Sequence, residues 1–106
     1  MNVGLRQIDL DFIIDVLKRT PEVDKALIFG SRAKEIYHRG SDVDLAVIGS
    51  DIDIKIISHL HFVLEEESPM PYFIDIVDYT HLMQPELKKE IDDNGVVIYE
   101  RFSGKQ

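Results

Sequence analysis

Two aspartates in this sequence stand at a spacing that could bind a metal ion. Asp42 and Asp44 are two residues apart at the start of an apolar segment, so in a strand both carboxylates point to the same face. Two charges at the mouth of a buried strand are costly unless something neutralises them. Mg²⁺ takes oxygen ligands and commonly binds one or two carboxylates together with the phosphate oxygens of a substrate. The pair therefore predicts a site for Mg²⁺.

A glycine–serine pair precedes these aspartates, with ten residues between Ser31 and Asp42. Gly30, between a predicted strand and a predicted short helix over residues 32–37, would let the backbone approach a ligand closely. The Ser31 hydroxyl and the free N–H groups of that helix N-terminus could then hold a phosphate. Arg32 could add charge-assisted hydrogen bonds to the same phosphates. Its alternative partner is Glu35, on the same helical turn.

A third carboxylate, Asp75, lies in the middle of an apolar segment. A salt bridge to Arg or Lys is one explanation for such a residue. If its strand lies beside the strand of Asp42 and Asp44, however, three carboxylates converge, as two-metal phosphoryl or nucleotidyl transfer requires. Asp75 would then help to take up the proton of the attacking hydroxyl. Asp78 competes for this role, but its odd spacing from Asp75 directs it to the opposite face.

Short apolar runs between turn residues predict the strands that would position these groups. We expect strands over residues 25–29, 42–48 and 72–77, and a short edge strand over residues 96–99. The strands alternate with predicted helices, so the chain reads as one small α/β domain over residues 1–106, with a mixed sheet flanked by helices.

Three longer helices are expected around this sheet. The first, around residues 10–17, would have Asp9 as its N-cap, and the last would run from Pro85 to the stop at Asn94. The middle helix carries apolar residues on one face between residues 56 and 64. The sequence Asp51-Ile52-Asp53 repeats the Asp-x-Asp pattern, and we assign it to the capping of this middle helix.

Composition narrows the classes of function. The chain has 106 residues and no cysteine, which excludes disulfides and thiolate zinc sites and favours a cytoplasmic protein. No apolar run is long enough to cross a membrane. The formal net charge of −8 repels phosphate backbones, so we expect no direct binding to nucleic acid. A polyphosphate ligand would need divalent cations between itself and the acidic protein.

The motif Gly30-Ser31, ten residues, Asp42-x-Asp44 resembles the signature of the DNA polymerase β-like nucleotidyltransferase superfamily. The short length, the sequence Gly30-Ser31-Arg32-Ala33, the later Asp75 and the close of the chain over residues 85–100 are similar to its minimal nucleotidyltransferase (MNT) branch. The resemblance covers nearly the whole chain. It implies a polymerase β-like nucleotidyltransferase fold in which Gly30 and Ser31 hold the triphosphate of ATP, while Asp42, Asp44 and Asp75 bind Mg²⁺, expected as two ions.

The same resemblance implies a partner. Such proteins are commonly encoded beside a HEPN-domain protein, an RNase toxin, and act as the antitoxin of a type VII-like toxin–antitoxin pair by transferring AMP to a toxin tyrosine. A homo- or hetero-oligomer would fit this arrangement. The chain departs from the family at Glu35, because members usually have Gly two residues after the Ala that corresponds to Ala33. Glu35 adds negative charge close to the expected phosphate site.

Two other functions are open from the sequence. The domain could neutralise its partner by docking alone, and Glu35 favours this hypothesis. It could instead be the donor half of a two-protein enzyme that acts on a small molecule. The retention of Ser31, Asp42, Asp44 and Asp75 argues for catalysis, because an inert module has no evident need for clustered carboxylates.

Overall fold

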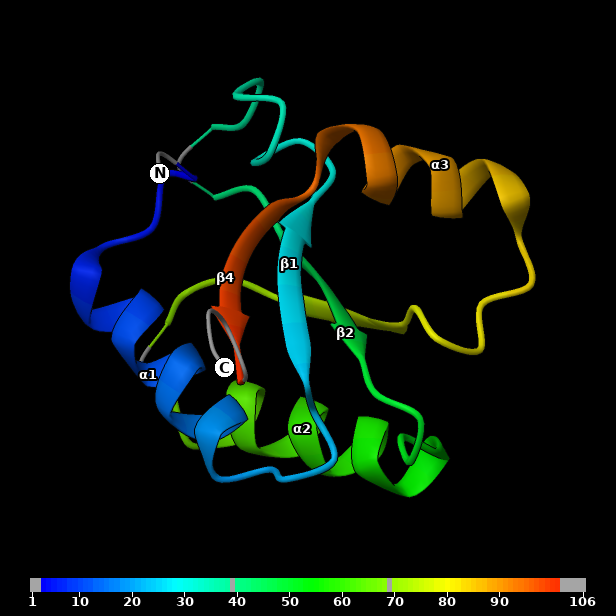
Figure 1. Cartoon of the computed structure of the whole chain (residues 1–106). Coiled ribbons are helices and arrows are strands. Elements are labelled where there is room, and N and C mark those ends of the chain that lie inside the picture. The colour runs from blue at the N-terminus through cyan, green and yellow to red at the C-terminus, as the bar shows by residue number, and fades with distance from the viewer. Residues whose placement is uncertain (1–2, 39, 69, 102–106) are drawn as a thin grey trace.

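The computed structural model describes residues 3–38, 40–68 and 70–101. The expected domain limits, residues 1 and 106, lie outside this part of the chain. Its elements follow one another in the order α1–β1–β2–α2–β3–α3–β4 (Figure 1). The helices are α1 (Gln7–Lys18), α2 (Ile54–Glu66) and α3 (Pro85–Asn94), and the strands are β1 (Lys25–Phe29), β2 (Val43–Ile48), β3 (Ile74–Asp78) and β4 (Val96–Glu100). None of these helices combines the length and the apolar character that crossing a membrane requires.

The four strands form one mixed sheet in the order β3-β2-β1-β4. Strand β1 is antiparallel to both β2 and β4, whereas β2 and β3 are parallel. Parallel neighbours need a crossover connection, and α2 supplies it. The mixed sheet flanked by helices confirms the predicted fold class, and β4 lies at a sheet edge as expected.

The two faces of the sheet are covered unequally. Helices α1 and α2 pack on one face, where Leu45 and Val47 of β2 belong to the main hydrophobic core. Helix α3 packs on the other face through Ile91, which meets Phe29 and Ala46 in a smaller apolar cluster. Figure 1 shows α3 near the end of β1 and away from α1 and α2. Because side chains alternate along a strand, Asp44 belongs to the face of α3.

Local signals explain where two of the helices begin. Asp53 is the N-cap of α2, and its carboxylate accepts a hydrogen bond of 3.0 Å from the backbone N–H of Ile56. This confirms that the second Asp-x-Asp sequence has a capping role. Helix α3 starts at Pro85, whose fixed φ suits a first helical position, and it stops before Gly95.

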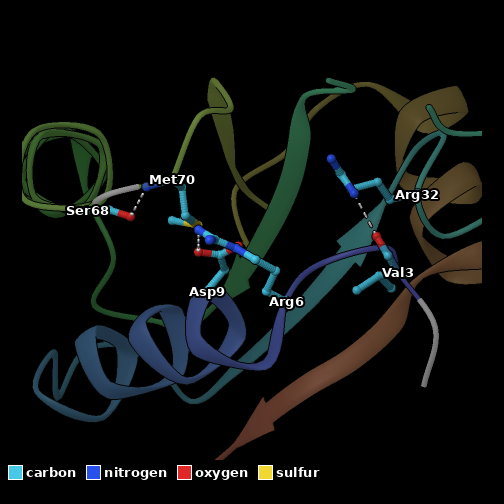
Figure 2. A network of polar contacts seen from close by, with 6 residues as sticks. All are labelled: Val3, Arg6, Asp9, Arg32, Ser68 and Met70. Carbon is cyan, nitrogen blue, oxygen red and sulfur yellow. Dashed lines mark hydrogen bonds and ion pairs between the residues drawn. The ribbon is translucent and has the colours of Figure 1, made fainter. Parts of the chain in front are cut away.

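The predicted cap of α1 is wrong. Its N-cap residue is Arg6, without a side-chain capping bond, and Asp9 lies inside the first helical turn. Asp9 is buried and receives two hydrogen bonds of 2.9 Å from the Arg6 guanidinium (Figure 2). A buried carboxylate needs a charged partner, and this bidentate pair supplies one.

Candidate active site

Strands β2 and β3 bring Asp44 and Asp75 side by side. The two residues are register partners across the parallel pair, on the same face of the sheet. Asp42 comes immediately before β2 and is exposed. The pairing of the two strands already starts there, because the Val43 N–H donates to the Phe73 carbonyl over 2.9 Å. The strand of Asp75 therefore lies beside that of Asp42 and Asp44, which meets the condition that the sequence analysis set for the carboxylates to converge.

The end of β1 and the turn after it lie against the Asp44 carboxylate. Gly30 follows Phe29, the register partner of Asp44, and has φ +73°, in the left-handed region that favours glycine. A Cβ atom at Gly30 would collide with Oδ2 of Asp44. The absence of a side chain at this position lets the Asp44 carboxylate lie directly against the backbone turn.

The predicted short helix over residues 32–37 is wrong. The chain makes one tight turn, closed by a 3.0 Å hydrogen bond from the Ile36 N–H to the Ser31 carbonyl. Glu35 ends the turn because its φ is +62°, a left-handed conformation that no helix continues through. Its side chain is exposed, and the expected alternative pairing with Arg32 is not formed. Ser31 thus lies in a turn and not at a helix N-terminus.

Arg32 lies inside the protein and does not face the carboxylates as a free cation. It is 1% exposed. Its Nη1 donates to the Val3 carbonyl over 2.9 Å (Figure 2). Its Nε and Nη2 both donate to the Ser41 carbonyl, over 3.2 and 2.7 Å. The guanidinium carbon is 5.3 Å from the ring centroid of Tyr37 and 4.7 Å from that of Tyr72. All three nitrogen positions are engaged within the chain.

An ion pair links the turn to α3. Lys34 Nζ lies 3.1 Å from Glu90 Oε2, an ion pair by distance. The two groups do not form a hydrogen bond, and Glu90 Oε2 is buried without a hydrogen-bond partner among the described residues. Since both side chains are partly exposed, we assign this pair a small contribution to stability.

The carboxylates influence one another electrostatically. The pKa of Asp44 is raised above its ordinary value, first by burial and then by the neighbouring charges of Asp75 and Asp42. A divalent cation would relieve this repulsion, so the chemistry of the donors fits Mg²⁺. Within residues 3–38, 40–68 and 70–101, however, no three His, Cys, Asp or Glu side chains are arranged to hold one metal ion. Asp44 and Asp75 are adjacent, and convergence with Asp42 on one ion stays a prediction.

Comparison with known proteins agrees with this geometry. The family model for polymerase beta, nucleotidyltransferase, matches residues 11–103. A solved toxin–antitoxin structure with AMP-PNP is 25% identical with a TM-score of 0.73, over 86% of this chain and 73% of that chain. The MntA–HepT toxin–antitoxin structure is 22% identical with a TM-score of 0.68, over 90% and 73% of the two chains.

A third similar structure holds a modified toxin. It is the complex of tri-AMPylated Shewanella oneidensis HEPN toxin with MNT antitoxin, 21% identical with a TM-score of 0.69, over 91% of this chain and 73% of that chain. These structural neighbours are MNT antitoxins of HEPN–MNT pairs, and they share the fold described above. No curated protein matches the sequence.

Proposed function

This chain belongs to the polymerase β nucleotidyltransferase family, and from that premise we propose that it transfers AMP from ATP to a tyrosine hydroxyl of a partner HEPN toxin. The observation that carries the proposal is the placement of Asp44 beside Asp75 and against the Gly30 turn. Two similar structures support the choice of nucleotide and acceptor, because one contains AMP-PNP and another an AMPylated HEPN toxin.

In the proposed reaction the turn at Gly30 and Ser31 holds the triphosphate, and Asp42, Asp44 and Asp75 hold Mg²⁺. When bound, Mg²⁺ would neutralise phosphate charge and lower the pKa of the attacking hydroxyl. The acceptor oxygen forms a bond to the α-phosphorus, and the bond from that phosphorus to the oxygen bridging to the β-phosphate breaks. Pyrophosphate leaves with this bridging oxygen. Asp75 takes up the proton of the acceptor hydroxyl.

A protein acceptor fits the charge of the chain. The formal net charge of −8 opposes binding of a nucleic acid backbone. Asp42 and Asp75 are exposed, so an acceptor could reach their carboxylates from outside. Such an acceptor must be presented by a second molecule.

The test is transfer of label from α-labelled ATP to a purified HEPN toxin in the presence of Mg²⁺. We expect the parent chain to label a toxin tyrosine and the Asp42→Asn/Asp44→Asn variant to lose at least about a hundredfold in rate, because metal and phosphate are no longer held. The matched control is Asp51→Asn/Asp53→Asn, which makes the same charge change in the other Asp-x-Asp sequence. Its helix cap survives, since Asn also caps well. Labelling by the Asp42/Asp44 variant at the parent rate would refute the proposal.

Docking without catalysis is the second candidate function. One observation favours it, namely the absence of a three-ligand group among the described residues. The same double variant separates the two functions. If the Asp42/Asp44 variant still neutralises the toxin in cells, docking suffices. If neutralisation is lost while the complex still forms, nucleotide transfer is required.

A further inference from the structure

We infer that Arg32 is a positioning residue of the active site, which fastens the peptide before Asp42 to the Gly30–Ser31 turn and to the N-terminal segment. The inference rests on the proposed function, because it gives Arg32 a role through the metal-binding carboxylate next to its partner. It differs from the expectation of phosphate contact, since the guanidinium donates to backbone carbonyls and is 1% exposed.

The first step of the argument is connectivity. Arg32 follows Ser31 in the chain, and its side chain donates twice to the carbonyl of Ser41, nine residues later. That carbonyl belongs to the peptide bond that leads into Asp42. One guanidinium therefore ties the phosphate-binding half of the Gly-Ser…Asp-x-Asp motif to its metal-binding half.

The second step is the environment of the charge. A buried guanidinium is costly to desolvate, and its described partners are carbonyl oxygens and the rings of Tyr37 and Tyr72. Tyr72 lies just before β3, the strand that carries Asp75. The same cluster thus touches the segments that lead into all three carboxylates.

The third step is the N-terminal segment. The Val3 carbonyl accepts from Arg32 Nη1 over 2.9 Å (Figure 2). Gly4 has φ +73°, and a Cβ atom there would collide with the Tyr37 ring and lie 2.9 Å from Arg32 Nη1. Val3 and Gly4 therefore complete the packing around Arg32.

These contacts matter for Asp42 in particular. Asp42 lies outside the hydrogen-bonded strand β2 and is exposed, so the sheet alone does not fix its carboxylate. Partners that orient metal ligands typically change metal affinity by about 10- to 100-fold when removed. We therefore expect Arg32 to set how well Asp42 joins Asp44 and Asp75 around an ion.

The test measures binding of Mn²⁺ in the presence of AMP-PNP, by electron paramagnetic resonance of the free ion. Arg32→Lys keeps the charge but loses the planar fork and should weaken Mn²⁺ binding about tenfold or more. The matched control is Arg101→Lys. Arg101 also donates to two carbonyls, those of Val23 and Thr20, over 3.1 and 3.0 Å, and lies 5.7 Å from the ring of Tyr99. It is remote from the carboxylates, so the control should bind Mn²⁺ within about twofold of the parent.

A second pair of variants tests the same positioning role in case Arg32→Lys does not fold. Tyr72→Phe keeps the ring under the guanidinium and should bind Mn²⁺ like the parent, while Tyr72→Leu removes the ring and should weaken binding by several-fold. Parent-like binding by folded Arg32→Lys, or by Tyr72→Leu if the first variant does not fold, would overturn the positioning role. If the parent chain itself binds no Mn²⁺ with AMP-PNP, the proposed function fails instead, so the two failures are distinguishable.

Discussion

The carboxylate of Asp44 lies against the backbone at Gly30 and beside Asp75, with its charge partly withdrawn from water. Burial and two neighbouring carboxylates all favour its protonated form, which raises its pKa. A carboxylate held in this way opposes folding when it is ionised and no cation is bound. Such an arrangement is typical of a ligand-binding residue and unusual for a purely structural one.

We predict that Asp44→Asn stabilises the free protein at neutral pH. Because the native pKa lies above the ordinary value of 3.8, the native state binds more protons than the unfolded state above that pH. The stability of the parent chain is therefore lost as pH rises through the native pKa, and Asn removes this loss. We expect a gain of up to about 1 kcal/mol in the free energy of unfolding at pH 7.5, discounted because the group is partly solvated.

Urea denaturation at pH 7.5 and at pH 4 would check this expectation, with the gain shrinking toward the lower pH. The exposed Asp51 provides the control, because Asp51→Asn removes the same charge outside the cluster and should change stability at pH 7.5 by less. A gain for Asp44→Asn that is larger at pH 4 than at pH 7.5 would contradict the assigned direction of the pKa shift.

At the scale of elements, the turn after β1 explains why a Gly is expected at the position of Glu35. Glu35 occupies the position where the resemblance to the family implies Gly, and its φ is +62°. The left-handed conformation costs a residue with a Cβ about 1–2 kcal/mol. The usual Gly is therefore explained by backbone geometry, and the exposed Glu35 side chain carries its charge outward.

We predict that Glu35→Gly stabilises the chain by up to about 1 kcal/mol, since relief of the left-handed strain outweighs the greater freedom of Gly in the unfolded state. Thermal unfolding of Glu35→Gly and Glu35→Ala separates the backbone from the charge. Alanine removes the charge and keeps the Cβ atom, so it should bring little gain. Equal stabilisation by both variants would show that the gain in stability comes from removing the charge and not from relieving backbone strain.

The elements that the sequence predicted well are those with local signals. The limits of β1 and α3 match the expected ones, because an apolar run bounded by turn residues and a Pro…Gly frame are read from neighbouring residues. The helix expected after Ser31 is absent because Glu35 adopts a left-handed conformation, which no propensity of Glu predicts. The family Gly at this position was the one available signal for a turn.

For the site, periodicity predicted that Asp42 and Asp44 share a face of their strand, and it left the approach of Asp75 conditional on the strand order, which the structure supplies by pairing Asp44 with Asp75. The buried position of Arg32 was missed, because the partners that bury it, Val3 and Tyr72, are far away in the chain. No local pattern distinguishes an Arg that stacks inside the protein from one that reaches a phosphate. The buried Asp9 was missed for another reason: its partner, Arg6, is only three residues away, but an Asp before an apolar helical pattern is read first as an N-cap.

At the scale of the whole molecule, the proposed function requires a chain of net charge −8 to bind a ligand that is itself negatively charged. We predict that AMP-PNP with Mg²⁺ raises the melting temperature. At a ligand concentration about a hundredfold above the Kd, the free energy of unfolding should increase by about 2.7 kcal/mol. Chelation of Mg²⁺ should abolish the shift, and Asp42→Asn/Asp44→Asn should not show it. Differential scanning calorimetry checks both. An equal shift with AMP-PNP in excess chelator would exclude a metal-bridged site.

The parallel pairing of β2 with β3 has a consequence for the order in which the protein folds. Strands β1 and β2 form an antiparallel pair without an intervening helix, whereas Asp75 can reach Asp44 only after α2 has crossed between β2 and β3. Contacts between segments separated by a whole helix form later than local ones. A partly folded or still growing chain would hold the first two carboxylates without the third. On the proposed function, the site for nucleotide transfer should therefore be completed in one late step of folding.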